Sequence, residues 1–167
     1  MLERMFDDLL RANAEFRAGY GLARLGAQAQ KHLGILTCMD TRIDPLAMLG
    51  LVPGDAKIVR NAGARVTSDA LRSLMLATNL LGVERIAVLQ HTDCAMAKNS
   101  DEALQAAVST ASGTDASGIE FLAIPDQAKT LRTDVDKIRA CPQIASTVIV
   151  AGFIYDVHTG GLELVVS

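Results

Sequence analysis

Short apolar segments alternate along this chain with segments of helical periodicity. The apolar segments span residues 33–38, 57–60, 85–90 and 147–151, and each is short enough to be a buried strand. Between them, apolar residues recur on one helical face in two segments, with Leu71, Leu74, Met75 and Thr78 in the first and Ala128, Leu131, Val135 and Ile138 in the second. Strands that alternate with helices are typical of an α/β domain. We therefore expect a mostly parallel sheet of about four strands, flanked by helices.

Turn and capping residues mark the ends of several expected elements. Thr67 or Ser68 can cap the helix around residues 71–78, and Gly82 lies just beyond its end. Asp44, which a proline follows, and Gly50 predict a short helix between them. A further helix is expected around residues 102–108, inside a surface segment rich in serine, threonine and alanine.

Both ends of the chain carry an additional expected element. Residues 156–161 separate two apolar runs and contain a Gly-Gly pair, so a hairpin should add a terminal antiparallel strand. The first 18 residues form an amphipathic helix, in which Leu2, Phe6, Leu9, Asn13 and Phe16 lie at helical spacing. This helix either docks on the core of its own chain or is an arm laid on a partner subunit. The 167 residues fit a single domain, residues 1–167, with residues 1–18 as a helical arm.

Composition and charge exclude several classes of function. Lysine and arginine total 16 against 19 aspartates and glutamates. The chain therefore lacks the excess of positive charge that is typical of nucleic-acid-binding proteins. No apolar run is long enough to span a membrane, and the N-terminus lacks the pattern of a secretory signal. Three cysteines without a regular framework indicate a reducing cytoplasm, in which free thiols are available to a metal.

Candidate metal ligands follow two of the expected strands. Cys38 ends the first strand, and His91 and Cys94 follow the third. The carboxyl ends of parallel strands form the ligand crevice of such sheets, so the three side chains converge if these strands are neighbours. Zinc favours thiolate and imidazole ligands, and a Cys-His-Cys set leaves one position for water or substrate. The alternative is that both cysteines are small packed core residues.

The remaining cysteine and the two remaining histidines have expected positions that do not involve a metal. Cys141 precedes a proline at a helix end and is expected to be packed, His32 lies at the entry of the first strand, and His158 lies in the terminal turn. Asp40 and Arg42 are two residues apart, so their side chains project to the same side of an extended segment. They either form a structural ion pair or work together at the metal, where Asp40 is a possible oxygen ligand.

Two motifs in this order resemble those of the β-class carbonic anhydrases, in particular the small bacterial type. Residues 38–42, Cys-Met-Asp-Thr-Arg, resemble the family's Cys-x-Asp-Ser-Arg, and residues 91–94, His-Thr-Asp-Cys, resemble its His-x-x-Cys. Residues 54–55 and 60–63 between them are also similar to a segment that helps to frame the family's site. The resemblance implies that Cys38, His91 and Cys94 hold Zn²⁺ and that Asp40 and Arg42 form a catalytic dyad. It also implies a homodimer or higher oligomer.

The reaction implied by the resemblance is reversible hydration of carbon dioxide to bicarbonate and a proton. Two departures from the family pattern stand out: Thr41 replaces a serine but keeps the hydroxyl group, and Ala95 replaces a glycine and adds a methyl group near the metal. In the resembled family, Asp40 would also be a possible fourth zinc ligand in a closed state. Carbon disulfide or carbonyl sulfide hydrolysis on the same site, and a catalytically silent zinc-stabilised binding domain, remain as alternatives.

Overall fold

A mostly parallel β-sheet forms the centre of the chain in the computed structural model, which describes residues 3–167. The strand order is β2-β1-β3-β4-β5. Parallel pairing joins the first four of these strands, and β5 runs antiparallel to β4 at the sheet edge. The strands are β1 (Leu33–Cys38), β2 (Ala56–Asn61), β3 (Arg85–His91), β4 (Ile149–Tyr155) and β5 (Leu162–Val166). The expected α/β fold class and the terminal hairpin are confirmed.

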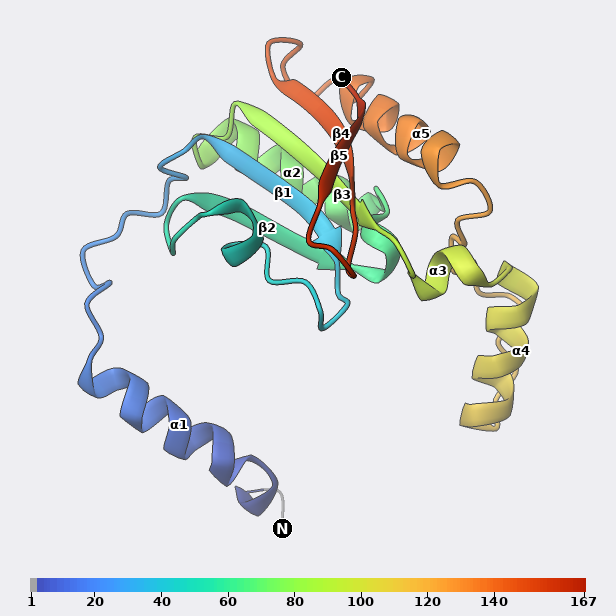
Figure 1. Cartoon of the computed structure of the whole chain (residues 1–167), viewed down its shortest axis with the longest axis horizontal. Coiled ribbons are helices and arrows are strands. Elements are labelled where there is room, and N and C mark those ends of the chain that lie inside the picture. The colour runs from blue at the N-terminus through green and yellow to red at the C-terminus, as the bar shows by residue number, and fades with distance from the viewer. Residues whose placement is uncertain (1–2) are drawn as a thin grey trace.

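Two long helices, α2 (Ser68–Leu80) and α5 (Gln127–Arg139), pack against one face of this sheet (Figure 1). Leu74 of α2 and Leu131 of α5 lie in one buried cluster with Leu36 and Val88 of the central strands. Thr67 caps α2 as expected, because its side chain accepts a hydrogen bond from the backbone N–H of Ala70. The remaining elements are η1 (Glu3–Phe6), α1 (Asp7–Ala18), η2 (Ala47–Leu49), η3 (Ala62–Ala64), α3 (Ala95–Lys98) and α4 (Asp101–Ser112).

The expected bounds of some helices and strands were wrong by a few residues. Residues 45–50 form only the 3-10 helix η2, although Asp44 does accept hydrogen bonds from the two backbone N–H groups at its start. The fourth strand begins at Ile149 rather than at 147, because the N–H of Val148 is used in a turn with the carbonyl of Ala145. Helix α4 is longer than expected, since Ser100 caps its start and Gly113 ends it with a φ of 70°.

Helix α1 contributes nothing to the core of its own chain. The structure buries none of its residues, and Figure 1 shows the helix standing apart from the sheet. The exposed large apolar side chains include Leu9 and Phe16 of α1 and Phe6 of the adjoining η1, all from the predicted stripe, whereas Leu2 lies outside the described residues. The helix is therefore not docked on its own core. Within residues 3–167, no helix combines the length and apolarity needed to cross a membrane.

The close approach of α5 to the sheet depends on Gly152 of β4. A Cβ atom at this position would lie 2.8 Å from Cγ of Leu131 and 3.1 Å from Cγ2 of Val135. Both are fully buried core side chains, so neither can move away without disturbing its neighbours. The absence of a side chain at Gly152 is thus a packing requirement.

We expect Gly152→Ala to lower the free energy of unfolding by about 1–3 kcal/mol, because the added methyl group overpacks the core. Urea denaturation with an unchanged m-value would measure the effect. Gly118→Ala is the matched control, since a Cβ atom there meets nothing within 4 Å and should change stability by less than about 0.5 kcal/mol. Equal stability of the two variants would contradict the packing argument.

Candidate metal centre

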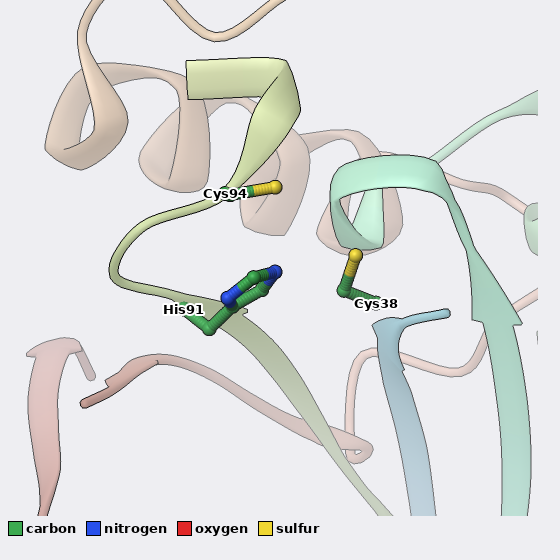
Figure 2. A group of neighbouring side chains, drawn as sticks. All are labelled: Cys38, His91 and Cys94. Carbon is green, nitrogen blue, oxygen red and sulfur yellow. The ribbon is translucent and has the colours of Figure 1, made fainter. Parts of the chain in front are cut away.

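Parallel pairing of β1 with β3 brings the candidate metal ligands together. The two strands are neighbours in the sheet, and the Thr37 hydroxyl donates a hydrogen bond to the carbonyl of Leu89 at 3.1 Å near their carboxyl ends. Cys38 ends β1, His91 ends β3, and Cys94 follows after a tight turn. Their potential ligand atoms lie within 4.8 Å of one another, and Figure 2 shows the three side chains pointing toward one another. The convergence expected from the sequence is present.

The imidazole of His91 is oriented for metal binding. Its Nδ1 lies 2.7 Å from the carbonyl oxygen of Thr92, so the ring proton belongs on Nδ1, which donates to that carbonyl. The other nitrogen, Nε2, is buried and has no hydrogen-bond partner within residues 3–167. Buried polar atoms are almost always satisfied, and a metal-bound histidine usually donates its second nitrogen to a carbonyl in this way. The unpartnered Nε2 therefore fits a metal ligand.

The two thiols of the cluster have opposite pKa shifts, because their mutual hydrogen bond lowers the pKa of Cys38 and raises that of Cys94. Hydrogen bonding with Cys94, together with a weaker contribution from the backbone N–H of Gly63, lowers the pKa of Cys38 well below that of an ordinary thiol. The Gly63 N–H lies 3.3 Å from the Cys38 sulfur. Thiolate is the form that binds metals, so this environment prepares Cys38 as a ligand. Two sulfurs and one imidazole nitrogen are the donor set of a zinc site with one open position.

A glycine allows the loop before α2 to reach the cluster. Gly63 lies in η3 with a φ of 73°, and a Cβ atom there would be 3.0 Å from both Ile124 and Met96. The preceding strand contributes Arg60, whose guanidinium donates to the carbonyl oxygens of Cys38 at 2.9 Å and Asp40 at 2.7 Å. Segment 60–63 thus frames the cluster, in agreement with the expectation from the sequence.

Asp40 and Arg42 form a two-point ion pair beside the cluster. Nε of Arg42 donates to Oδ1 of Asp40 at 2.9 Å, and Nη2 donates to Oδ2 at 2.8 Å. These hydrogen bonds, with a further one from the Arg42 backbone N–H, hold the pKa of Asp40 well below its usual range. Oδ2 of Asp40 lies 3.9 Å from Nε2 of His91. An ionised carboxylate is therefore held at the edge of the ligand set.

A hollow of about 380 Å³ opens over the cluster. Ala95 lines it but is itself exposed, and as the first residue of α3 it needs no glycine-like backbone. Apolar side chains of Met39, Ala62 and Met96 make up much of the remaining wall. The hollow suits a small and largely apolar substrate next to one carboxylate. Its lining residues are Cys38, Met39, Asp40, Thr41, Arg42, Ala62, Gly63, His91, Cys94, Ala95 and Met96.

The remaining histidines and the third cysteine lie elsewhere. His32 contacts the carbonyl oxygen of Gly82 at the amino end of the sheet, and His158 is exposed in the turn between β4 and β5. Cys141 is buried after α5, where its sulfur lies 3.5 Å from Oε1 of Gln143. These positions agree with the plainer assignments made from the sequence.

Two supporting residues were not identified from the sequence. Asp93 accepts a hydrogen bond from Nη1 of Arg42 at 2.6 Å. Arg65, which is 7% exposed, donates through Nε to Asp134 of α5 at 2.6 Å and also contacts the carbonyl oxygen of Leu122. The acidic residue inside the His-x-x-Cys motif was a signal for the first. Arg65 and Asp134 are 69 residues apart, and no local pattern joins them.

We expect the purified chain to bind about one divalent metal ion, because a rigid sheet positions three soft or borderline ligands. Cys38→Ser and Cys94→Ser should each lose the metal, as measured by elemental mass spectrometry. Cys141→Ser is the matched control, since Cys141 is a buried free cysteine outside the cluster, and it should retain the metal. Full metal content in both ligand variants would contradict the assignment.

Several known proteins are similar to this chain. The family model described as carbonic anhydrase matches residues 33–116. β-Carbonic anhydrase 1 of Mycobacterium tuberculosis is 35% identical over 94% of this chain and 95% of its own length. The crystal structure of carbonic anhydrase from Streptococcus mutans superposes with a TM-score of 0.90 at 36% identity, covering 96% of each chain. A carbon disulfide hydrolase of Saccharolobus solfataricus is 51% identical over 48% of this chain and 40% of its own length. The chain belongs to the β-class carbonic anhydrase family.

Proposed function

We propose that this protein is a zinc enzyme that catalyses the reversible hydration of carbon dioxide to bicarbonate and a proton. The observation that carries the proposal is the buried Cys38–His91–Cys94 cluster with an unpartnered His91 Nε2 and an ionised carboxylate beside it. The similarity to β-carbonic anhydrase 1 of Mycobacterium tuberculosis over nearly the whole chain supports the same reaction.

Zinc is the metal that best matches this donor set. Cys38 and Cys94 would supply thiolates and His91 an imidazole, a combination that excludes the hard cations calcium and magnesium. Zinc held by three protein ligands lowers the pKa of a bound water molecule toward neutrality, which provides a hydroxide nucleophile. The three buried free cysteines support a reducing cytoplasm as the setting.

Asp40 would orient the attacking oxygen, and Arg42 would keep Asp40 ionised for that task. Because two hydrogen bonds from Arg42 hold the pKa of Asp40 low, the carboxylate is a hydrogen-bond acceptor at neutral pH rather than a store for a proton. A hydrogen-bond acceptor fixed at this edge of the cluster would align the O–H group of the nucleophile. A lone pair of the attacking oxygen would then be free to react with the substrate carbon. Met39, Ala62 and Met96 would accommodate the apolar substrate.

Asp40 has a second possible position in this proposal. Its Oδ2 lies 3.9 Å from Nε2 of His91, so after a side-chain rotation Asp40 would be able to serve as a fourth protein ligand of the metal in place of water. The ion pair with Arg42 holds it in the other position in the structure. Arg42 would therefore determine how often the metal is available to the reaction.

Carbon disulfide hydrolysis is the second candidate function. The carbon disulfide hydrolase of Saccharolobus solfataricus is 51% identical to this chain over 81 residues. Carbon disulfide is, like carbon dioxide, a small linear molecule, and the largely apolar wall of the hollow would accept either. A domain that only binds zinc would turn over neither substrate.

Stopped-flow hydration of carbon dioxide, with carbon disulfide and carbonyl sulfide assayed in parallel, tests these functions. We expect carbon dioxide hydration in the wild type, and Asp40→Asn should lower kcat by about 10²–10⁴-fold because the oriented acceptor is lost. Arg42→Ala should also lower kcat while retaining the metal. Arg72→Ala, which removes an exposed arginine that also pairs with an aspartate, is the matched control and should remain fully active. A zinc-loaded wild type that acts on carbon disulfide but not on carbon dioxide would replace the first function by the second.

We further propose that α1 is an arm that covers a second copy of the chain. The helix buries nothing in its own chain, yet Leu9 is 59% and Phe16 60% exposed. Monomeric proteins rarely leave such a contiguous apolar stripe in water. The N-terminal helix is the segment best placed to cross to a neighbour, because it stands apart from the sheet (Figure 1).

We expect light scattering to give a wild-type mass of at least twice the chain mass, and the double variant Leu9→Asp with Phe16→Asp to give a smaller assembly. The variant Arg11→Gln with Ala14→Asp is the matched control, because it changes the net charge by the same −2 on the opposite side of α1. The control should keep the wild-type mass. A monomeric wild type, or a stripe variant of unchanged mass, would rule out the arm.

A further inference from the structure

The guanidinium group of Arg42 is held from two sides. On one side it forms the two-point pair with Asp40 through Nε and Nη2. On the other side Nη1 donates to Oδ2 of Asp93 at 2.6 Å, and Nη2 donates to the backbone oxygen of Asp93 at 3.2 Å. All three nitrogens of the planar group are therefore engaged. Because Asp93 supplies two acceptors on one side, the guanidinium plane of Arg42 is already oriented toward the Asp40 carboxylate on the other side.

Asp93 is fixed independently of the loop that carries Asp40 and Arg42. It lies in the turn after β3 with a φ of 60°, a left-handed conformation that aspartate tolerates better than most residues. The preceding Thr92 anchors the turn, because its N–H donates to the carbonyl oxygen of Tyr155 and its hydroxyl donates to Asp156. Movement of Asp40 therefore need not displace Asp93.

Lys98 balances the charge of this arrangement. Its ammonium group at the end of α3 pairs with Oδ1 of Asp93, the oxygen that does not accept from Nη1 of Arg42. Without that second cation, Arg42 alone would neutralise two carboxylates, one negative charge would be left over, and Asp93 would compete more strongly with Asp40 for the guanidinium. With Lys98 in place, the two acids and two bases sum to zero, and Arg42 remains a strong partner for Asp40.

We propose that Asp93 and Lys98 are positioning residues that hold Arg42 in the orientation that captures the Asp40 carboxylate and keeps it away from the fourth metal position. This inference rests on the proposed roles of Asp40 and Arg42. Removing Asp93 would release Nη1 and free a side chain that is 40% exposed. Arg42 would then sample other rotamers, and Asp40 would spend more time next to His91 and the metal.

The experiment compares Asp93→Asn and Lys98→Gln with the wild type by two measurements. The first is the solvent exchange rate of the Arg42 Nε–H, measured by NMR in the metal-free protein, which reports on the Arg42–Asp40 pair without any activity. The second is the affinity of azide for the cobalt-substituted protein, followed by visible absorption, because azide competes with Asp40 for the fourth position. We expect exchange about tenfold faster and azide binding about tenfold weaker in Asp93→Asn, as for the loss of one charge-assisted hydrogen bond.

Lys98→Gln should shift both measurements in the same direction, and Lys98→Arg should restore wild-type values because it keeps the charge. Asp69→Asn is the matched control, since Asp69 pairs with Arg72 on the surface of α2, away from the cluster, and should change neither measurement. Wild-type exchange or wild-type azide affinity in both Asp93→Asn and Lys98→Gln overturns the inference. If instead the wild type fails to hydrate carbon dioxide while both variants shift as expected, the proposed reaction is wrong and the positioning role stands.

Discussion

Everything at the candidate metal centre depends on the parallel pairing of β1 with β3. That pairing sets Leu36 beside Val88 and Thr37 beside Leu89, so the chain leaves both strands at the same edge of the sheet. Cys38 and His91 are brought together by backbone hydrogen bonds rather than by any property of their own side chains. Since an antiparallel arrangement would place the two residues at opposite ends of the sheet, the fold itself decides whether a ligand cluster exists.

A second layer of contacts positions what the strands bring together. Arg65 and Asp134 form a buried ion pair that ties η3 to α5, and the same guanidinium reaches the carbonyl oxygen of Leu122. Two residues further on lies Ile124, whose N–H donates to the carbonyl oxygen of Met96 at 2.7 Å and whose side chain packs in the cluster with Cys38 and Cys94. The wall of the metal site is thus supported from α5. Because the Arg65 guanidinium is almost fully buried, loss of Asp134 would leave its charge uncompensated, whereas Asp134 also pairs with Lys137 at 3.1 Å.

The sequence predicted the parts of this structure that local patterns encode. The bounds of β1 were predicted to the residue, since an apolar run ends abruptly at charged loop residues, and the Thr67 cap marked the start of α2. The two short motifs, which lie at the ends of predicted strands, singled out Cys38, His91, Cys94, Asp40 and Arg42 as candidate site residues, and these side chains lie close together in the structure. Contacts between distant segments escaped prediction. The acidic residue inside the His-x-x-Cys motif does not reveal its partner, Arg42, which is 51 residues away, and a turn at Val148 moved the start of β4 by two residues.

The isolation of α1 has a thermodynamic consequence for the chain. A helix of 12 residues that buries no side chain has little beyond its own backbone hydrogen bonds to offset the entropy lost on ordering, and such helices are marginal in water. Its helical state is therefore stabilised mainly by whatever covers the apolar stripe. If the cover is another copy, mass action links the order of α1 to protein concentration, while the sheet and its candidate metal ligands are stabilised by contacts within one chain. On dilution α1 would melt separately, and helical content would report on association before the core begins to unfold.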